Sequence, residues 1–163
     1  MADAQGDLSR EFSSDIAYAI VFHPSQQSLA VACHDNAVAV LDIGTSSITA
    51  VLSGHSRPVT GATFLSGKTP LLLSCSDDQT IRVWDAASAT VVRALTNHTQ
   101  PVTCFAVRPA DGDALPIVAS GSEDRTVRFW QPGTGRLVRF QRLNSPHCNR
   151  LDDEWFRSPR GWT

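Results

Sequence analysis

Short segments dominated by apolar and β-branched residues recur along the chain, with polar turn residues between them. They cover residues 16–22, 28–34, 37–43, 47–53, 59–65, 71–77, 80–86, 89–95, 102–109, 116–123, 126–132 and 135–141. Segments of this length and composition, bounded by Ser, Gly, Asn and Asp, are typical of β-strands. None of them has the apolar period of an amphipathic helix. The pattern therefore predicts an all-β protein.

A twelve-residue segment occurs twice with few changes. Residues 74–85 read SCSDDQTIRVWD, residues 120–131 read SGSEDRTVRFWQ, and a His-x-x-Pro-Val-Thr segment precedes each copy. A more divergent copy at residues 29–42 keeps Asp35 and Asp42 but has Leu41 in place of the tryptophan. A period of about 40 to 45 residues with Gly-His and Trp-Asp marks is typical of propeller blades. We therefore expect an incomplete β-propeller of about three four-stranded antiparallel blades, with no closed ring in one chain.

Each of the two strong copies contains four residue types that can form one hydrogen-bonded chain. They are a histidine before the first strand, a serine on the second, an aspartate in the next turn and a tryptophan on the third. A buried indole N–H needs an acceptor, which a hydroxyl can supply. The candidates are His55, Ser74 or Ser76, Asp78 and Trp84 in one copy, and His98, Ser120 or Ser122, Asp124 and Trp130 in the other.

These residues and their spacing resemble the WD-repeat family over roughly residues 16–143. Two departures are that Gln131 replaces the aspartate of Trp-Asp and Asn97 replaces the glycine of Gly-His. The resemblance implies a rigid platform that binds protein partners through loops on one face. The loop residues expected to contact a partner are Ser56, Arg57, Gln79, Thr99, Gln100 and Arg125.

The repeat divides the chain into a flexible N-terminal segment (1–15), a degenerate blade (16–55), two regular blades (56–98 and 99–143) and a divergent, disordered tail (144–163). Three blades cannot surround a channel, since propellers have about four to eight. We therefore expect exposed strand edges and an uncovered apolar face. Either the chain self-associates to complete a ring, with two copies supplying six blades, or it is a fragment of a longer propeller.

The tail after Leu143 does not continue the strand pattern. Reading its codons one base later, from within His147, permits an alternating apolar strand followed by a turn. One hypothesis is that the coding sequence is interrupted near Pro146, so that the tail is out of frame. The alternative is a genuine, mildly basic tail.

Composition narrows the function classes further. The net charge of −2 gives no general attraction to nucleic acid or an anionic membrane, and no apolar run is long enough to span a bilayer. The first fifteen residues do not resemble a signal peptide. The four cysteines include no Cys-x-x-Cys pair, so we expect a cytoplasmic protein without metal or cofactor. Arg82 and Arg128 are expected at solvated strand positions.

Serine, histidine and aspartate together also suggest a hydrolase. No Gly-x-Ser-x-Gly motif is present, and the constellation occurs at equivalent positions of a structural repeat. We therefore expect a non-catalytic scaffold for protein–protein interaction, truncated or fragmentary. The alternatives are a blade segment of a larger enzyme or signalling protein whose chemistry lies outside this chain, and a non-functional truncated product.

Overall fold

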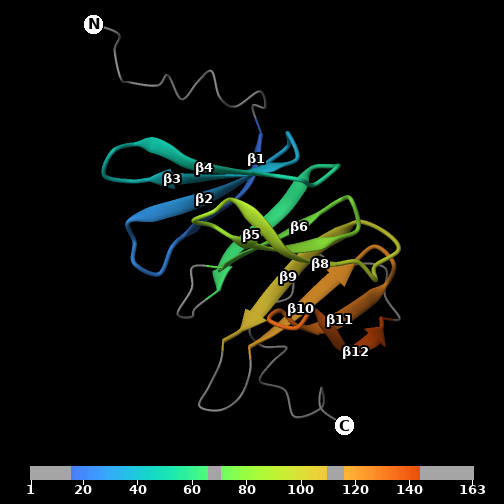
Figure 1. The fold of residues 1–163 in the computed structure, drawn as a ribbon. Coiled ribbons are helices and arrows are strands. Elements are labelled where there is room, and N and C mark those ends of the chain that lie inside the picture. Colours follow the sequence, from blue (N-terminus) through green and yellow to red (C-terminus); the bar gives the residue numbers. More distant parts are fainter. Residues whose placement is uncertain (1–15, 66–70, 110–115, 144–163) are drawn as a thin grey trace, which may run out of the picture.

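The computed structural model describes residues 16–65, 71–109 and 116–143, all in strands or their connections (Figure 1). This part of the chain has no helix that could cross a membrane. The segments predicted at residues 1–15 and 144–163 lie outside the described residues. The strands are β1 (Ala17–Phe22), β2 (Ser28–Cys33), β3 (Ala37–Asp42), β4 (Ser47–Ser53), β5 (Val59–Leu65), β6 (Leu71–Ser76), β7 (Ile81–Asp85), β8 (Thr90–Leu95), β9 (Val102–Arg108), β10 (Ile117–Ser122), β11 (Thr126–Gln131) and β12 (Arg136–Arg142).

The strands form three four-stranded antiparallel sheets, in which consecutive strands are neighbours. We call β1–β4 the first blade, β5–β8 the second and β9–β12 the third. In each blade the register shifts between the first and second strands and again between the third and fourth. The three sheets do not close a ring, so the predicted fold class, an incomplete propeller, is confirmed.

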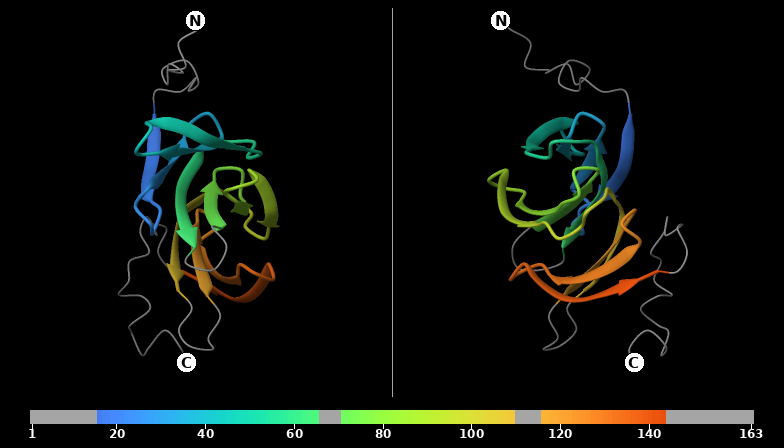
Figure 2. Two further views of the ribbon diagram at one scale, coloured as in Figure 1. Left: turned by 60° about the vertical axis from the view of Figure 1, so that its left-hand side comes forward. Right: turned by 90° about the vertical axis from the view of Figure 1, so that its right-hand side faces the viewer.

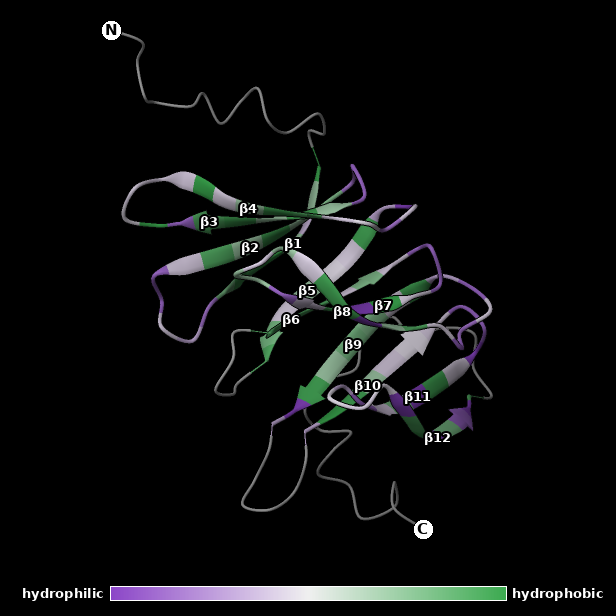
Figure 3. Ribbon diagram, in the orientation of Figure 1, coloured by the Kyte–Doolittle hydropathy of each residue, from purple (hydrophilic) through white to green (hydrophobic). Residues whose placement is uncertain are grey.

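The blades stack face to face in chain order (Figure 2). Strands β1, β2 and β3 contact β5, and strands β5 and β6 contact β9. Successive strand residues point to opposite faces of a sheet, so alternate residues of the second blade face the first and third blades. Most apolar residues lie on the strands and most connections are polar, although β11 and β12 also carry hydrophilic residues (Figure 3).

Each of the two interfaces between blades buries a tryptophan. Trp84, fully buried, packs into a cluster with residues of the first blade, among them Ala30, Val38 and Leu52. Trp130 of the third blade packs into a cluster with residues of the second, among them Leu73, Ile81, Val83 and Leu95. In both interfaces the large ring of the later blade covers smaller side chains of the earlier blade.

We predict that Trp84→Ala lowers the free energy of unfolding by about 3 to 5 kcal/mol, because it leaves a cavity between two sheets. Urea denaturation followed by far-ultraviolet circular dichroism measures the change. The control is Phe140→Ala on β12, an aromatic residue that is 57% exposed, for which we expect a loss of about 1 kcal/mol or less. Equal losses for the two variants would contradict the assignment.

Candidate functional site

The second blade holds a hydrogen-bonded chain that starts at its buried tryptophan. Trp84 on β7 donates its indole N–H to the hydroxyl of Ser74 on β6, with 2.7 Å between Nε1 and Oγ. The same oxygen lies 2.7 Å from Nε2 of His55, which precedes β5. Nδ1 of His55 lies 2.7 Å from Oδ2 of Asp78, in the turn between β6 and β7. This series of hydrogen bonds therefore links strands β6 and β7, the turn between them and the connection from the first blade.

One arrangement of protons satisfies every group in this chain. The Ser74 oxygen accepts the indole hydrogen, so its own hydrogen is available to Nε2 of His55. Nδ1 then carries the imidazole hydrogen and donates it to the Asp78 carboxylate. The imidazole is neutral in this arrangement, and the charge resides on the carboxylate.

Asp78 also joins the turn to the preceding loop. Its Oδ2 accepts the backbone N–H of Ser56 at 3.1 Å. Its Oδ1 accepts the backbone N–H of Thr80 at 3.0 Å and the Thr80 hydroxyl at 2.6 Å. Thr80 is not among the residues predicted from the sequence, although an Asp-x-Thr triplet occurs in both strong copies and could have indicated it.

Ser76 takes part in a different contact from Ser74. Its hydroxyl donates to the carbonyl of Arg57 and accepts the backbone N–H of Asp78, both at 3.0 Å. The sequence left open which serine partners the tryptophan. The structure assigns Ser74 to the indole and Ser76 to the loop, because Ser76 lies two residues nearer the turn.

The third blade repeats these contacts. Trp130 donates to Ser120 at 2.8 Å, Nε2 of His98 lies 2.8 Å from the Ser120 oxygen, and Nδ1 lies 2.8 Å from Asp124. The Thr126 hydroxyl donates to Asp124 at 2.6 Å. The Ser122 hydroxyl also contacts the Gln100 carbonyl at 3.0 Å and the Asp124 N–H at 3.1 Å.

Hydrogen bonding decides the protonation of the buried aspartates. Burial disfavours ionisation of Asp78, but the hydrogen bonds from His55 and Thr80 outweigh it and hold its pKa well below the usual range. For Asp124 burial again opposes ionisation, and the hydrogen bonds from Thr126 and His98 again lower the pKa. Both carboxylates are therefore ionised at neutral pH.

Burial lowers the pKa of His98 and outweighs the opposing effect of the Asp124 carboxylate. The nearby Arg128 lowers it further. The contact between His98 and Asp124 at neutral pH is therefore a hydrogen bond from a neutral imidazole to a carboxylate.

The first blade has apolar residues at most of the equivalent positions. Leu41 pairs with Leu29 as Trp84 pairs with Leu72, so Leu41 takes the place of the tryptophan. By the same register, Val31 of the first blade has the position of Ser74 in the second, and Ala37 has the position of Thr80. Asp35 keeps the turn, since its carboxylate accepts the Ala37 N–H at 3.4 Å.

Arg82 and Arg128 are half-buried, so their prediction as solvated strand positions is wrong. The Arg82 guanidinium lies 5.9 Å from the Trp84 ring centroid. Arg128 donates from Nε to the Thr126 hydroxyl at 3.2 Å and lies 3.7 Å from Asp124. The reason is strand alternation, which directs residues two positions apart to the same face of the sheet.

Aspartate, histidine and serine are linked in the order found in hydrolase triads, but the serine is inaccessible. Ser74 is 0% exposed, and its oxygen already accepts the indole hydrogen. Among the described residues, no three His, Cys, Asp or Glu side chains are grouped so that they could hold a metal ion. Burial raises the pKa of the Cys33 thiol to about 11 and that of Cys75 to about 12, which disfavours the reactive thiolates.

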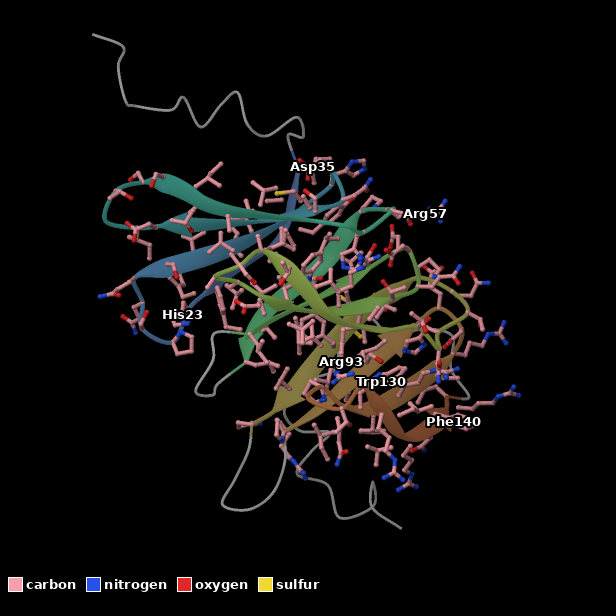
Figure 4. The ribbon with its side chains drawn as sticks, in the orientation of Figure 1. His23, Asp35, Arg57, Arg93, Trp130 and Phe140 are labelled. Carbon is pink, nitrogen blue, oxygen red and sulfur yellow. The ribbon has the colours of Figure 1, made fainter. Side chains whose placement is uncertain are left out.

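The predicted loop residues lie at one end of the second and third blades, next to the two clusters. All six side chains are exposed, and Figure 4 shows Arg57 at this end of the molecule. His23, on the turn between β1 and β2, lies at the other end of the sheets from Asp35 (Figure 4). The six residues are Ser56, Arg57, Gln79, Thr99, Gln100 and Arg125.

The fold consists of four-stranded antiparallel sheets that stack face to face with a tryptophan buried in each interface. These features place the protein in the β-propeller class. The profile of the family described as "WD domain, G-beta repeat" matches residues 46–85 and 89–131, about half of the chain. The chain therefore belongs to the WD-repeat family. A search of curated proteins found no match. WD repeats generally mediate protein–protein interaction or scaffolding.

We predict that Ser74→Ala lowers the free energy of unfolding by roughly 2 to 4 kcal/mol, because it leaves the Trp84 indole and Nε2 of His55 buried without their partner. Urea denaturation measures the loss. Ser88→Ala, at an exposed turn, is the control and should cost about 0.5 kcal/mol or less. A Ser74 variant as stable as the control would refute the network's contribution.

We predict that stability falls as the pH is lowered. Because the pKa of His98 is lower in the folded state, the unfolded chain binds more protons below about pH 6.5, the ordinary histidine value. The lowered pKa values of Asp78 and Asp124 add a second loss below about pH 4, since these carboxylates protonate more readily in the unfolded chain. Thermal melts from pH 8 to pH 3 measure both.

His98→Gln removes one titrating group, so its melting temperature should change less than that of the wild type between pH 7 and pH 5. The matched control is His34→Gln, at an exposed position, whose melting temperature should change between pH 7 and pH 5 as much as that of the wild type. A wild-type slope in the His98 variant would show that this histidine does not contribute.

Proposed function

We propose that the chain is a non-catalytic scaffold that binds a protein partner through the loop end of its second and third blades. The observation that carries the proposal is a fixed backbone beneath the six exposed loop side chains. Each of the six residues has a backbone group bonded to a serine or aspartate of the two clusters.

In the second blade, the N–H of Ser56 bonds to Asp78 at 3.1 Å and the carbonyl of Arg57 bonds to Ser76 at 3.0 Å. The N–H of Gln79 bonds to the Ser76 carbonyl at 3.2 Å. Gln79 has a φ of 73°, so the turn holds it in the left-handed region. These bonds restrict the backbone and leave the side chains exposed.

The third blade has the same arrangement. The N–H of Thr99 bonds to Asp124 at 3.2 Å, and the carbonyl of Gln100 bonds to Ser122 at 3.0 Å. Arg125 has a φ of 61°, and its N–H bonds to the Ser122 carbonyl at 3.1 Å. Two adjacent blades therefore present equivalent sets of exposed polar side chains.

Preorganised loops favour binding, because less conformational entropy is lost when a partner docks. The exposed guanidinium groups of Arg57 and Arg125 are suited to carboxylates, which they can hold in bidentate pairs. A protein surface with acidic side chains is therefore the partner chemistry that this end favours.

Two observations support the absence of catalysis in the clusters. A serine nucleophile must reach its substrate, whereas Ser74 and Ser120 are both 0% exposed. The same set of bonds also occurs in two blades at equivalent positions, as expected for a network that stabilises the repeat.

We predict that reversing the charge of both loop arginines, Arg57→Glu with Arg125→Glu, weakens binding of the protein partner at least tenfold. Partners are first captured with the wild-type chain and identified by mass spectrometry. Affinity is then measured with the purified partner. The control is Arg136→Glu at the start of β12, an exposed arginine that pairs with Gln131 at the opposite end of the third blade from the loops, and it should bind as the wild type does. Equal binding by all three proteins would overturn the proposed surface.

A further inference from the structure

We propose that a second copy of this chain completes the propeller, giving a two-chain ring of six blades. In this ring the uncovered face of the first blade packs against the uncovered face of the third blade of the partner copy. The two uncovered faces correspond to the two sides of the blade interfaces that already exist within the chain.

The uncovered face of the first blade carries large apolar residues of β1. Ile20 is 63% exposed and Phe22 is 61% exposed. Phe22 pairs with Leu29 on the next strand, just as Phe64 of the second blade pairs with Leu72. Phe64, at the equivalent position, is only 8% exposed because it packs against the first blade. The face of the first blade is therefore built like one that is covered elsewhere in the same chain.

Two leucines of the neighbouring strands extend this apolar face across the sheet. Leu29 and Leu41 of the first blade have the positions of Leu72 and Trp84, which are fully buried in the second blade. In the second blade this bulky face packs against small residues of the first blade, including Ala30 and Ala32. A matching surface must therefore offer small side chains at the equivalent positions.

The third blade has such a surface on the face that points away from the second blade. The strand register makes Ala119 of the third blade equivalent to Ala30 of the first, since Ala119 pairs with Ala106 and Ala30 with Val21. In the same way Gly121 is equivalent to Ala32, since Gly121 pairs with Cys104 and Ala32 with Ala19. Among the described residues, Ala119 packs on this face with apolar side chains of its own blade and with Leu143. The positions of Ala30 and Ala32 are therefore small again on the third blade, which gives the bulky face room at these two positions. Phe129 and Gln141 replace Val40 and Leu52 elsewhere on this face.

Polar contacts between the second and third blades indicate the same junction. The Thr60 hydroxyl donates to the Val102 carbonyl at 2.7 Å, and Nε of Arg93 donates to the Gly133 carbonyl at 2.9 Å. Arg93 lies where the second and third blades meet (Figure 4). Both donors reach backbone carbonyls of the following blade.

The third blade has a threonine and an arginine at the equivalent positions, Thr103 and Arg139. The Thr103 hydroxyl also contacts the Gly121 carbonyl of its own blade at 3.5 Å, just as the Thr60 hydroxyl contacts the Cys75 carbonyl at 3.2 Å. The equivalent acceptors on a following blade are the carbonyls of Ala17 and Gly44, which belong to the first blade of a second copy. The first blade, in contrast, has an alanine, Ala50, at the arginine position. The outward face of the third blade thus has the same two residue types as the face of the second blade that contacts the third blade.

The number of blades limits the assembly to two copies. This contact is head-to-tail, so it forms a ring when the rotation closes and a filament when it does not. Propellers have about four to eight blades. The described residues of two chains supply six blades, which lies in this range, whereas those of three chains would supply nine.

The experiment is light scattering coupled to size-exclusion chromatography on the full chain. We expect a mass twice the chain mass of 17.6 kDa. Phe22→Glu should halve the mass, because it places a charge in both interfaces of the ring. The matched control is Val92→Glu on β8, a 48% exposed apolar residue of the second blade, which should leave the mass unchanged. Circular dichroism checks that each variant is folded.

A mixing experiment tests the head-to-tail geometry. Ala106→Glu on the third blade should also give monomers, yet an equimolar mixture with Phe22→Glu should recover a two-chain species, because one intact interface forms between the two variants. A wild-type monomer, a three-chain or larger assembly, or a dimer that Phe22→Glu leaves intact would overturn the proposal, as would a mixture that stays monomeric. The inference does not depend on the loop partner, because mass is measured without one.

Discussion

The hydrogen bond from a buried indole N–H to a serine hydroxyl is the constraint on which the regular blades depend. Trp84 fills the space between two sheets, so water cannot reach its N–H, and an unpaired donor there would be costly. The Ser74 oxygen accepts a hydrogen bond from the indole, and the Ser74 hydroxyl donates one to Nε2 of His55. His55 in turn donates from Nδ1 to Asp78. The packing of one aromatic ring therefore determines how the loop at the end of the sheet is held.

The first blade illustrates this dependence by lacking both parts. Leu41 has no N–H to satisfy, and the position of the accepting serine is occupied by Val31. Asp35 still bonds to the backbone of its own turn, so the turn persists without the rest of the network. Serine and threonine are therefore needed where a tryptophan is buried, and apolar residues can replace them where it is not.

Much of the fold could be predicted from the sequence, because strand alternation and the repeat are local patterns. The twelve strands lie close to the predicted segments, and the histidine, aspartate and tryptophan of each strong copy are brought together. The sequence did not show that Ser74 bonds to the indole and Ser76 to the loop, since this depends on how far each serine lies from the turn. Thr80 was missed although the Asp-x-Thr triplet occurs in both strong copies. Arg82 was placed in solvent because the residue type, and not the sheet face that it shares with Trp84, guided the prediction.

The sequence by itself determined the all-β class, the three blades and the residue types of the clusters, because these follow from periods of two residues and of one blade. The tertiary structure alone decided which face of each sheet is buried, through the stacking of the second blade between the other two. It also decided that the serine hydroxyls are inaccessible and that the six loop side chains are exposed. These properties depend on contacts between segments far apart in the chain, and such contacts arise when the sheets pack together.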